Sequence, residues 1–380
     1  MTFQDFLLQQ TTIDNLLSVY NISTPNEMQI KAYKTISSGR DMIISSPTGS
    51  GKTLAYLLPL VSSVDITLKT VQAVITAPSQ ELCMQINKIL ANLYDKDIFT
   101  DKSAVLIGDG NIQRQIEQLK KKPVFIIGTP GRIRQLIENK KLSVHNVKTL
   151  ILDEADKLFD KNNYDNMYFI RKSCMKRTQV LLFSASISNK TLKLANNYTY
   201  NPVIYNLNQN SSSPIPKTIK HFYVVTDRRE RIETLRKIVK ALNCNKAIIF
   251  INSRYDLDET FQKLEYHHYK AASISGTKDK MLKKKAIDDF ASGNVNYLLS
   301  TDISARGLQF DNIDTVVNLN LPEETTDYQH RAGRCGRNDN PGICVSIITE
   351  NELPKIKKLQ KQFNINMLQK KLYNGKLVSK

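Results

Sequence analysis

Two short stretches of the chain combine the residue types that bind a nucleotide phosphate and a divalent cation. Residues 46–53 read Ser-Pro-Thr-Gly-Ser-Gly-Lys-Thr, and residues 153–156 read Asp-Glu-Ala-Asp directly after the apolar run 149–152. Glycines allow the backbone to approach a phosphate, whose oxygens accept hydrogen bonds from successive N–H groups at the start of a helix. A carboxylate at the end of a buried strand is a ligand that Mg²⁺ accepts.

The two stretches together predict an ATP·Mg²⁺ site. We expect Lys52 to reach the β- and γ-phosphates, Thr53 and Asp153 to hold Mg²⁺, and Glu154 to orient or deprotonate the attacking water. The remaining residues of the phosphate loop expected to contact ATP are Ser46, Thr48, Gly49, Ser50 and Gly51. A glycine-rich turn and a solvated acidic helix cap are the alternatives for each stretch alone, but their joint occurrence favours the nucleotide site.

The elements that must position these residues form an α/β pattern. Short apolar runs at 42–44, 73–76, 104–107, 124–127, 150–152 and 180–183 alternate with helical stretches, which predicts a parallel sheet covered on both faces. The polar, proline-containing segment 207–216 interrupts the pattern and is expected to be a linker. The same alternation of apolar runs and helical stretches returns with apolar runs at 222–225, 247–251, 297–299, 316–319 and 343–348. We therefore predict domains at 1–206 and 217–380, with a cleft between them.

The composition favours a polyanionic partner. Across 380 residues the formal net charge is +18, although a compositional bias towards lysine would give the same excess. The five cysteines are scattered and the histidines show no zinc-like spacing, so no structural metal is predicted. No basic leader and no run of about 18 apolar residues occurs, and we expect a cytoplasmic protein.

Motif by motif and in order, the chain resembles the DEAD-box family of ATP-dependent RNA helicases over roughly residues 3 to 350. The family takes its name from the tetrad at 153–156. The resemblance implies two RecA-like domains, each a parallel sheet flanked by helices, and an RNA-stimulated ATPase. In the family an upstream aromatic and a Pro-x-x-x-Gln segment recognise adenine, and here Phe3 and Gln29 correspond. A glutamine offers the donor and the acceptor that an adenine edge requires.

The second half carries the family's last motif as His-Arg-Ala-Gly-Arg-Cys-Gly-Arg at 330–337. The resemblance implies that Arg334 and Arg337 reach the γ-phosphate, with Arg337 as the arginine finger. It also implies that a set of residues couples the nucleotide state to RNA: Asp156, Ser184, Ser186 and His330. Gln309 stands where the family has an aspartate that holds the ribose, which is expected to weaken nucleotide binding.

The residues matched to RNA contacts depart further from the family pattern. The candidates are Ser79, Gly110, Thr129, Arg132, Arg254, Gly276 and Thr301. Gln80, Ser275, Lys280 and Lys283 replace an arginine, a histidine, a glutamine and an arginine of the family. Lysine attracts a phosphate as a point charge but does not fix its geometry, so we expect RNA binding to survive and its coupling to strand separation to be weaker.

The resemblance implies an RNA helicase that melts short duplexes by closing two domains on single-stranded RNA, with little sequence readout, and we expect it to be a monomer. Short members of this kind look bacterial, and the resemblance implies a role in ribosome biogenesis with ribosomal particles as partners. The alternatives are an ATP-gated RNA clamp or scaffold with weak unwinding, and a DNA helicase or another P-loop motor. The basic segment from Lys355 to Lys380 is expected to be a closing helix, with an RNA-gripping extension as the alternative.

Overall fold

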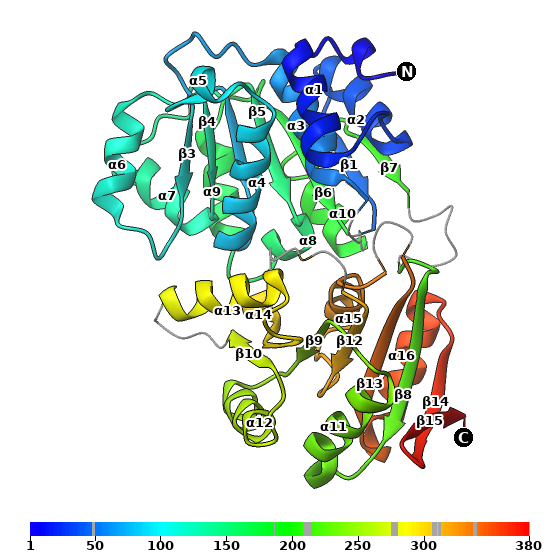
Figure 1. Cartoon of the computed structure of the whole chain (residues 1–380). Helices are drawn as coiled ribbons and strands as arrows, with labels where there is room; N and C mark the ends of the chain where they lie inside the picture. Colours follow the sequence, from blue (N-terminus) through cyan, green and yellow to red (C-terminus); the bar gives the residue numbers. More distant parts are fainter. Residues whose placement is uncertain are drawn as a thin grey trace. The chain divides into compact units, whose positions relative to one another are not determined.

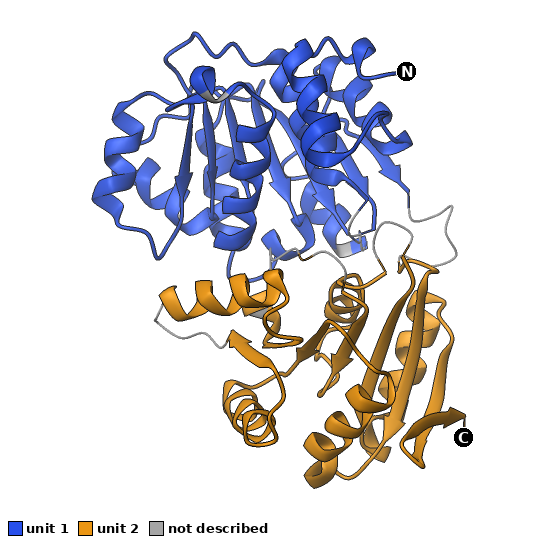
Figure 2. Cartoon of the chain, in the orientation of Figure 1, with its two compact units in different colours: residues 1–208 blue, residues 209–380 orange. Residues whose placement is uncertain are grey.

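The computed structural model of the chain describes residues 1–47, 50–185, 187, 189–207, 215–274, 280–305, 310, 313–336 and 340–379. The chain folds into two compact units, residues 1–208 and 209–380 (Figure 2). The boundary between the units falls inside the segment that the sequence predicts as a linker, and most of that segment lies outside the described residues.

Unit 1 is built on a parallel sheet of seven strands in the order β3-β4-β2-β5-β6-β1-β7 (Figure 1). The strands are β1 Met42–Ser45, β2 Ala73–Thr76, β3 Ser103–Leu106, β4 Phe125–Gly128, β5 Thr149–Asp153, β6 Gln179–Ser184 and β7 Val203–Asn206. The six runs predicted from the sequence correspond to β1 through β6. The edge strand β7 is missing from the prediction, because only alternate residues of this strand are half-buried.

Helices cover both faces of this sheet. The α-helices of unit 1 are α1 Gln10–Tyr20, α2 Glu27–Ser37, α3 Lys52–Ser63, α4 Gln80–Asn92, α5 Lys96–Phe99, α6 Ile112–Lys120, α7 Pro130–Glu138, α8 Ala155–Leu158, α9 Tyr164–Ser173 and α10 Asn189–Ala195, and the 3₁₀ turn η1 is Gln4–Phe6. In β2, Ala73 and Ile75 join the core that contains α2, α3 and α4, whereas Val74 joins the core that contains α7 and α9. Successive residues of a strand point to opposite faces, so a sheet covered on both sides needs the continuous apolar runs seen here.

Unit 2 has a sheet of eight strands in the order β10-β11-β9-β12-β13-β8-β14-β15. The strands are β8 Ile219–Val225, β9 Ala247–Phe250, β10 Ala271–Ile274, β11 Tyr297–Ser300, β12 Thr315–Asn318, β13 Gly342–Ile348, β14 Met367–Tyr373 and β15 Lys376–Ser379. The terminal pair of β14 and β15 is antiparallel, and the other pairs are parallel. The prediction includes five of these strands and lacks β10, β14 and β15.

The helices of unit 2 are α11 Arg231–Ala241, α12 Arg254–Tyr266, α13 Lys280–Ser292, α14 Asp302–Ala305, α15 Thr325–Ala332 and α16 Leu353–Phe363, with 3₁₀ turns η2 Arg228–Glu230 and η3 Glu350–Glu352. Helix α16 closes the core by burying Ile356, Leu359 and Phe363. The predicted closing helix is therefore present, but the basic segment continues beyond it into the β14–β15 hairpin (Figure 1). Among the described helices, none is long and apolar enough to cross a membrane.

Candidate nucleotide and RNA site

The predicted site residues of unit 1 gather at the carboxyl edge of its sheet. Strand β1 pairs in parallel with β6, and β6 with β5, with Ser45 opposite Ser184 and Asp153 opposite Phe183. The phosphate loop after β1 and the acidic end of β5 therefore lie at the same edge. Ligands of open α/β sheets bind at this edge because the loops and helix N-termini that follow the strands converge there.

The phosphate loop is held by its own side chains. Nζ of Lys52, the first residue of α3, donates hydrogen bonds of 2.7 Å to the carbonyl oxygens of Ser46 and Pro47. The Ser46 hydroxyl donates to Ser50 Oγ at 2.7 Å, and Ser50 Oγ donates to the Pro47 carbonyl at 2.7 Å. Ser46, which stands where phosphate loops usually have their first glycine, thus links two parts of the loop through its hydrogen bond to Ser50. Thr48 and Gly49 of the predicted site lie outside the described residues.

Gln29 lies against this loop. It forms a capping box with Asn26 at the start of α2, and Asn26 Nδ2 donates to the Ser50 carbonyl oxygen at 3.0 Å. Gly51 has φ +88°, and a Cβ atom there would lie 2.9 Å from Gln29 Nε2, so only glycine fits. Phe3 is 2% exposed and packs edge-to-face on Phe6 in the core. The contact of Gln29 and Phe3 with adenine stays a prediction.

Asp153 is a buried carboxylate, 3% exposed, whose two oxygens each accept a hydrogen bond. The hydroxyl of Tyr56 donates to Oδ2 at 2.8 Å, and the backbone N–H of Glu154 donates to Oδ1 at 2.9 Å. Burial, and then the charge of Glu154, raise the pKa of Asp153 to about 6, against the opposing effects of the Tyr56 hydrogen bond and the Lys52 charge. The hydroxyl of Tyr56 also interacts with the side chain of Thr53. Tyr56 therefore joins the two predicted magnesium ligands, a role that the sequence does not reveal.

Glu154 adopts a left-handed backbone conformation with φ +52° and ψ +52°. Such a conformation is strained for a residue with a side chain and is found preferentially at functional sites. It places Glu154 at the N-cap of α8, directly after β5. From the same helix, Asp156 Oδ1 accepts a hydrogen bond of 2.6 Å from Ser184 Oγ at the end of β6. The structure thus brings together two of the predicted coupling residues, whereas Ser186 lies outside the described residues.

The RNA candidates of unit 1 follow strands β2, β3 and β4, on the other half of the same edge. Ser79 caps α4 by accepting a hydrogen bond from Leu82 N at 3.2 Å, and Thr129 lies at the N-cap position of α7. The guanidinium of Arg132 donates to the carbonyl oxygens of Gly108 and Gly110. A Cβ atom at Gly110 would lie 2.3 Å from Gln115 Nε2, so a side chain there would displace the Gln115 amide. The nucleotide and RNA candidates of unit 1 thus share one edge.

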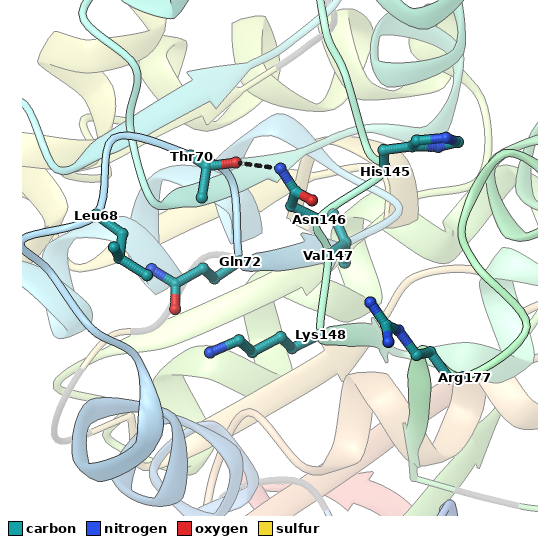
Figure 3. Close-up of a pocket in the computed structure, with 8 residues that line it drawn as sticks. All are labelled: Leu68, Thr70, Gln72, His145, Asn146, Val147, Lys148 and Arg177. Atoms are coloured by element: carbon teal, nitrogen blue, oxygen red, sulfur yellow. Dashed lines mark hydrogen bonds between the residues drawn. The ribbon is translucent and has the colours of Figure 1, made fainter.

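A cavity of about 540 Å³ in unit 1 lies at the opposite edge. Figure 3 shows Thr70 and Gln72 before β2, residues 145–148 before β5 and Arg177 before β6 around this cavity, with Asn146 Nδ2 donating to Thr70 Oγ1 at 3.0 Å. Because these residues precede β2, β5 and β6, and the candidate residues Asp153 and Ser184 stand at the far ends of β5 and β6, this cavity is separate from the candidate nucleotide site.

The candidates of unit 2 also follow the carboxyl ends of neighbouring strands. Arg254 begins α12 after β9, and Thr301 follows β11, where its Oγ1 accepts a hydrogen bond from Ser304 N at 3.3 Å. His330 lies in the last turn of α15, and Arg334 follows that helix. The remaining predicted residues of this unit lie outside the described residues: Gly276, Gln309 and Arg337.

Arg331 is a residue of the last helicase motif whose role sequence reasoning missed. It is 1% exposed, and its Nε and Nη2 atoms each donate at 2.6 Å to the carboxylate of Asp302 on α14. Further hydrogen bonds run from Nη2 to Asn252 Oδ1 at 2.8 Å, and from Nη1 to the Asn320 carbonyl oxygen at 2.7 Å and to Asn318 Oδ1 at 3.2 Å. This arginine ties the loops after β9 and β12 to α14 and α15. The high density of arginine at 330–337 signals a basic motif but does not distinguish the buried arginine from the others.

The fold and the site define a class of protein. A phosphate loop between a strand and a helix, a buried acidic strand end beside it, and two α/β units with mainly parallel sheets are the features of a nucleotide hydrolase built from RecA-like domains. Family models agree: residues 26–195 match the DEAD/DEAH box helicase model, and residues 230–339 match the helicase conserved C-terminal domain.

The similar proteins carry the same family name. The chain is 36% identical over 371 residues to the probable ATP-dependent RNA helicase YfmL of Bacillus subtilis, covering 98% of this chain and 97% of the relative. It is 35% identical to the DEAD-box ATP-dependent RNA helicase CshC of Bacillus cereus, covering 93% and 89% of the two chains. The chain belongs to the DEAD-box family of ATP-dependent RNA helicases. The predictions of an ATP-hydrolysing enzyme and of an RNA helicase are thereby confirmed.

Solved structures show the same fold. Saccharomyces cerevisiae Dbp5 bound to RNA and ADP BeF3 matches with a TM-score of 0.86 at 24% identity, over 97% of this chain and 95% of that one. Mss116p bound to single-stranded RNA and AMP-PNP matches with a TM-score of 0.86 at 24% identity, over 98% of this chain and 80% of that one. The predicted fold class, with two RecA-like domains, is confirmed.

Proposed function

We propose that the carboxyl edge of the sheet in unit 1 binds ATP·Mg²⁺ and hydrolyses ATP. The observation that carries this proposal is the Tyr56 hydroxyl, which donates to Asp153 and interacts with Thr53 beside the phosphate loop. A buried carboxylate next to a hydroxyl suits Mg²⁺, which takes one or two protein oxygens and completes its shell with phosphate oxygens and water. When bound, Mg²⁺ neutralises charge on the β- and γ-phosphates.

The residues around this pair have separate tasks in the proposal. The Lys52 ammonium releases the loop carbonyl oxygens and binds the phosphates instead. Glu154, held by its left-handed backbone conformation, orients or deprotonates the attacking water. Arg334 and Arg337 stabilise the charge that develops on the γ-phosphate. Gln309 holds the ribose, with less strength than a carboxylate. These assignments rest on the position of each residue in the family motifs.

We also propose how ATP hydrolysis acts on RNA. Single-stranded RNA binds along its backbone to the RNA candidates of both units, closure of the domains bends the strand and melts a short duplex, and hydrolysis releases it. The hydrogen bond between Ser184 and Asp156 supports this coupling, because it joins the strand end beside the phosphate loop to the helix that follows Glu154. Action as a monomer, in the cytoplasm and on ribosomal particles stays a prediction.

The test measures ATP turnover with and without RNA in Lys52→Ala and Glu154→Gln. Each variant should lose a factor of about 10² or more, since removal of one group that stabilises transition-state charge typically costs that much. Lys69→Ala and Glu138→Gln, exposed positions of the same unit, are the matched controls and should keep full turnover. Turnover within about threefold of the unmodified chain in either site variant would contradict the assignment, since the expected loss is far larger.

A second candidate function is an ATP-gated RNA clamp with weak unwinding. The observation that favours it is the set of substitutions on the RNA side, Gln80, Ser275, Lys280 and Lys283. Strand displacement measured beside ATP turnover separates the two functions, because a clamp hydrolyses ATP with RNA present and displaces little strand. Stimulation by DNA as strong as stimulation by RNA would favour neither and would point to another P-loop motor.

A further inference from the structure

The carboxy-terminal segment of unit 2 carries a charge that the helicase motifs do not use. Residues 353–380 contain eight lysines and no acidic residue. Helix α16 buries Ile356, Leu359 and Phe363, and its lysines lie on the exposed side. In the part of the chain that the structure describes, no ion pair with a carboxylate is formed by Lys355, Lys357, Lys358, Lys361, Lys371 or Lys376. This unneutralised charge requires a partner outside the chain or serves solubility alone.

A groove lies at the start of β8 and β14, and lysine side chains line it. It encloses about 520 Å³ and is lined by both strands and by the segments that precede them. Strands β8 and β14 are parallel, with Leu368 opposite Phe222, so Lys220, Phe222, Leu368 and Lys370 point to one face of the sheet. Leu368 is 46% exposed, and the Lys370 ammonium lies over the Phe222 ring, 5.2 Å from its centre. The floor of the groove is therefore apolar and its wall cationic.

The charge around this groove has one sign. Lys217, Lys220 and Lys370 line it, and among its described lining residues there is no aspartate or glutamate. An aromatic floor with lysines beside it suits single-stranded nucleic acid, whose bases stack on the ring while its phosphates attract the lysines. Strand β8 is paired with β13 and β14, and β15 covers β14 from Lys370 onwards, so a peptide that adds as a further strand would find only the short β14 edge from Met367 to Gln369. The groove thus offers mainly side chains and little strand edge.

The groove also touches the last helicase motif. Thr218, next to Lys217, donates from its hydroxyl to the Gly336 carbonyl oxygen at 3.1 Å. A Cβ atom at Gly336 would lie 2.5 Å from Ile219 Cγ1, so the strand start and the motif are in close contact. Gly336 lies between Arg334 and Arg337 in the sequence. A ligand in the groove therefore binds residues of a segment that packs on the arginine motif.

We propose that this groove is a second binding site for single-stranded RNA, in addition to the contacts of the helicase motifs. The inference extends the proposed function, since it takes RNA as the partner of the chain. One base replaces the Lys370 ammonium over Phe222 and also contacts Leu368, and flanking phosphates bind Lys217, Lys220 and the released Lys370. The site holds RNA in every nucleotide state, because all of its residues belong to unit 2.

The test uses the full chain and a labelled single-stranded RNA of about 20 nucleotides, without ATP, and follows binding by fluorescence anisotropy at several salt concentrations. Lys217→Gln/Lys220→Gln/Lys370→Gln should make the slope of log affinity against log salt less negative by about 2, since each phosphate neutralised on a single strand contributes about 0.7. Phe222→Leu should lower affinity at least about fivefold and leave the slope unchanged, because it removes stacking and no charge. ATP turnover without RNA should be unaffected in both variants.

The matched control removes the same charge from helix α16. Lys355→Gln/Lys358→Gln/Lys361→Gln changes exposed lysines of a helix that packs on the other face of the sheet, in the core that contains Ile219. For this control, the slope of log affinity against log salt should equal that of the unmodified chain. Equal slopes for the unmodified chain and both triple variants would overturn the groove proposal. An equal change of slope in both triple variants would also overturn it and would attribute the salt dependence to diffuse charge.

Two further outcomes separate the partners. Binding of poly-glutamate is measured with the unmodified chain and with the groove variant. If only the unmodified chain binds it, while the slope of log RNA affinity against log salt is the same in both, the groove binds an acidic protein and the RNA proposal is overturned. If the unmodified chain bound no RNA at all, the proposed function itself would fail, whereas RNA binding that the groove variant leaves intact would overturn the groove alone.

Discussion

The hydroxyl of Tyr56, on α3, donates a hydrogen bond of 2.8 Å to Oδ2 of Asp153 at the end of β5. Both groups are buried, and burial raises the pKa of Tyr56 well above its ordinary value, so the phenol stays a donor. The bond stabilises the ionised form of Asp153, whose pKa burial raises. It also links the helix that begins with Lys52 to the strand that presents Asp153. The two halves of the proposed phosphate site are thereby positioned by Tyr56, which contacts neither phosphate nor water in the proposal.

Tyr56→Phe should lower ATP turnover about tenfold and raise the Mg²⁺ concentration needed for half-maximal turnover. The reason is that a hydrogen bond to a charged group contributes about 1.5–3 kcal/mol, and its loss leaves a buried carboxylate oxygen without a donor. Turnover as a function of Mg²⁺ concentration measures both effects. Tyr198→Phe is the control, since Tyr198 is a buried tyrosine of the same unit whose hydroxyl donates to the Tyr164 carbonyl at 3.3 Å, away from any carboxylate of the site. Equal Mg²⁺ curves for the two variants would show that the Tyr56 hydroxyl has no special role.

Arg331→Lys should destabilise unit 2 by roughly 2–4 kcal/mol. Lysine keeps the charge but cannot form the two parallel bonds to Asp302 while also reaching Asn252 and Asn320, and a buried ion pair that loses a partner typically costs about 3–5 kcal/mol. Calorimetry of the full chain should show the transition of unit 2 at a lower temperature and that of unit 1 unchanged. Arg228→Lys, an exposed arginine of the same unit, should shift neither. An unaltered thermogram for Arg331→Lys would refute the structural role.

Those parts of the fold whose signal is local could be predicted from the sequence. Continuous apolar runs such as 149–152 must be buried on both faces, so the central strands were predictable. Strand β7 at Val203–Asn206 and strand β14 at Met367–Tyr373 bury only alternate or scattered side chains, and their pairing depends on neighbours far along the chain. Strand β10 at Ala271–Ile274 is short and its residues are mostly small, so its apolar signal is weak. Edge elements were missed for this reason.

The site followed the same division. Lys52 and Asp153 could be predicted as site residues because phosphate and metal chemistry favours those residue types in those positions. Tyr56 and Arg331 act through contacts with residues distant in sequence, Asp153 and Asp302, and an isolated tyrosine or a further arginine carries no pattern that reveals such a contact. Three-dimensional proximity was needed to assign them.

Stability of unit 2 should depend on pH through His221. This histidine is buried, its Nδ1 lies 2.8 Å from the Tyr328 hydroxyl, and burial lowers its pKa from 6.5 to about 4. Between these values the unfolded chain binds the proton and the folded chain does not, so the free energy of unfolding falls as pH falls. The contribution of His221 to the free energy of unfolding is fully present above pH 6.5 and is lost as the pH falls to about 4. At 1.36 kcal/mol per pH unit, the loss reaches about 2 kcal/mol at pH 5.

His221→Asn should remove most of this pH dependence, because asparagine can still accept from the Tyr328 hydroxyl and does not titrate. Calorimetric transitions of unit 2 between about pH 5 and pH 7.5 measure it, a range that covers most of the expected proton uptake. His267→Asn, a change at an exposed histidine of the same unit, is the control. The same slope of stability against pH in His221→Asn and in the unmodified chain would place the dependence on other groups.

The last prediction concerns the substitutions on the RNA side. Gln80 is the first residue of α4, directly after the N-cap Ser79, and Lys283 lies in the first turn of α13. In the family pattern both positions carry arginine, whose planar fork fixes a phosphate in two bonds where lysine only attracts it. The phosphate-loop lysine, Asp153 and Glu154 of the proposed nucleotide site all match the family pattern. Hydrolysis should therefore be more intact than its coupling to strand separation.

Gln80→Arg/Lys283→Arg should then raise the unwinding of a short duplex more than it raises ATP turnover without RNA. Both rates are measured on one duplex at fixed salt, and their ratio gives the strands separated per ATP hydrolysed. Lys284→Arg combined with Gln80→Asn is the control, since it introduces an arginine beside the tested position and leaves both family positions without one. An unchanged ratio in the double variant would show that Gln80 and Lys283 already transmit hydrolysis to the RNA as well as arginine does. A ratio that rises equally in the control would attribute the gain to a nearby guanidinium in general and not to its fixed geometry at the two family positions.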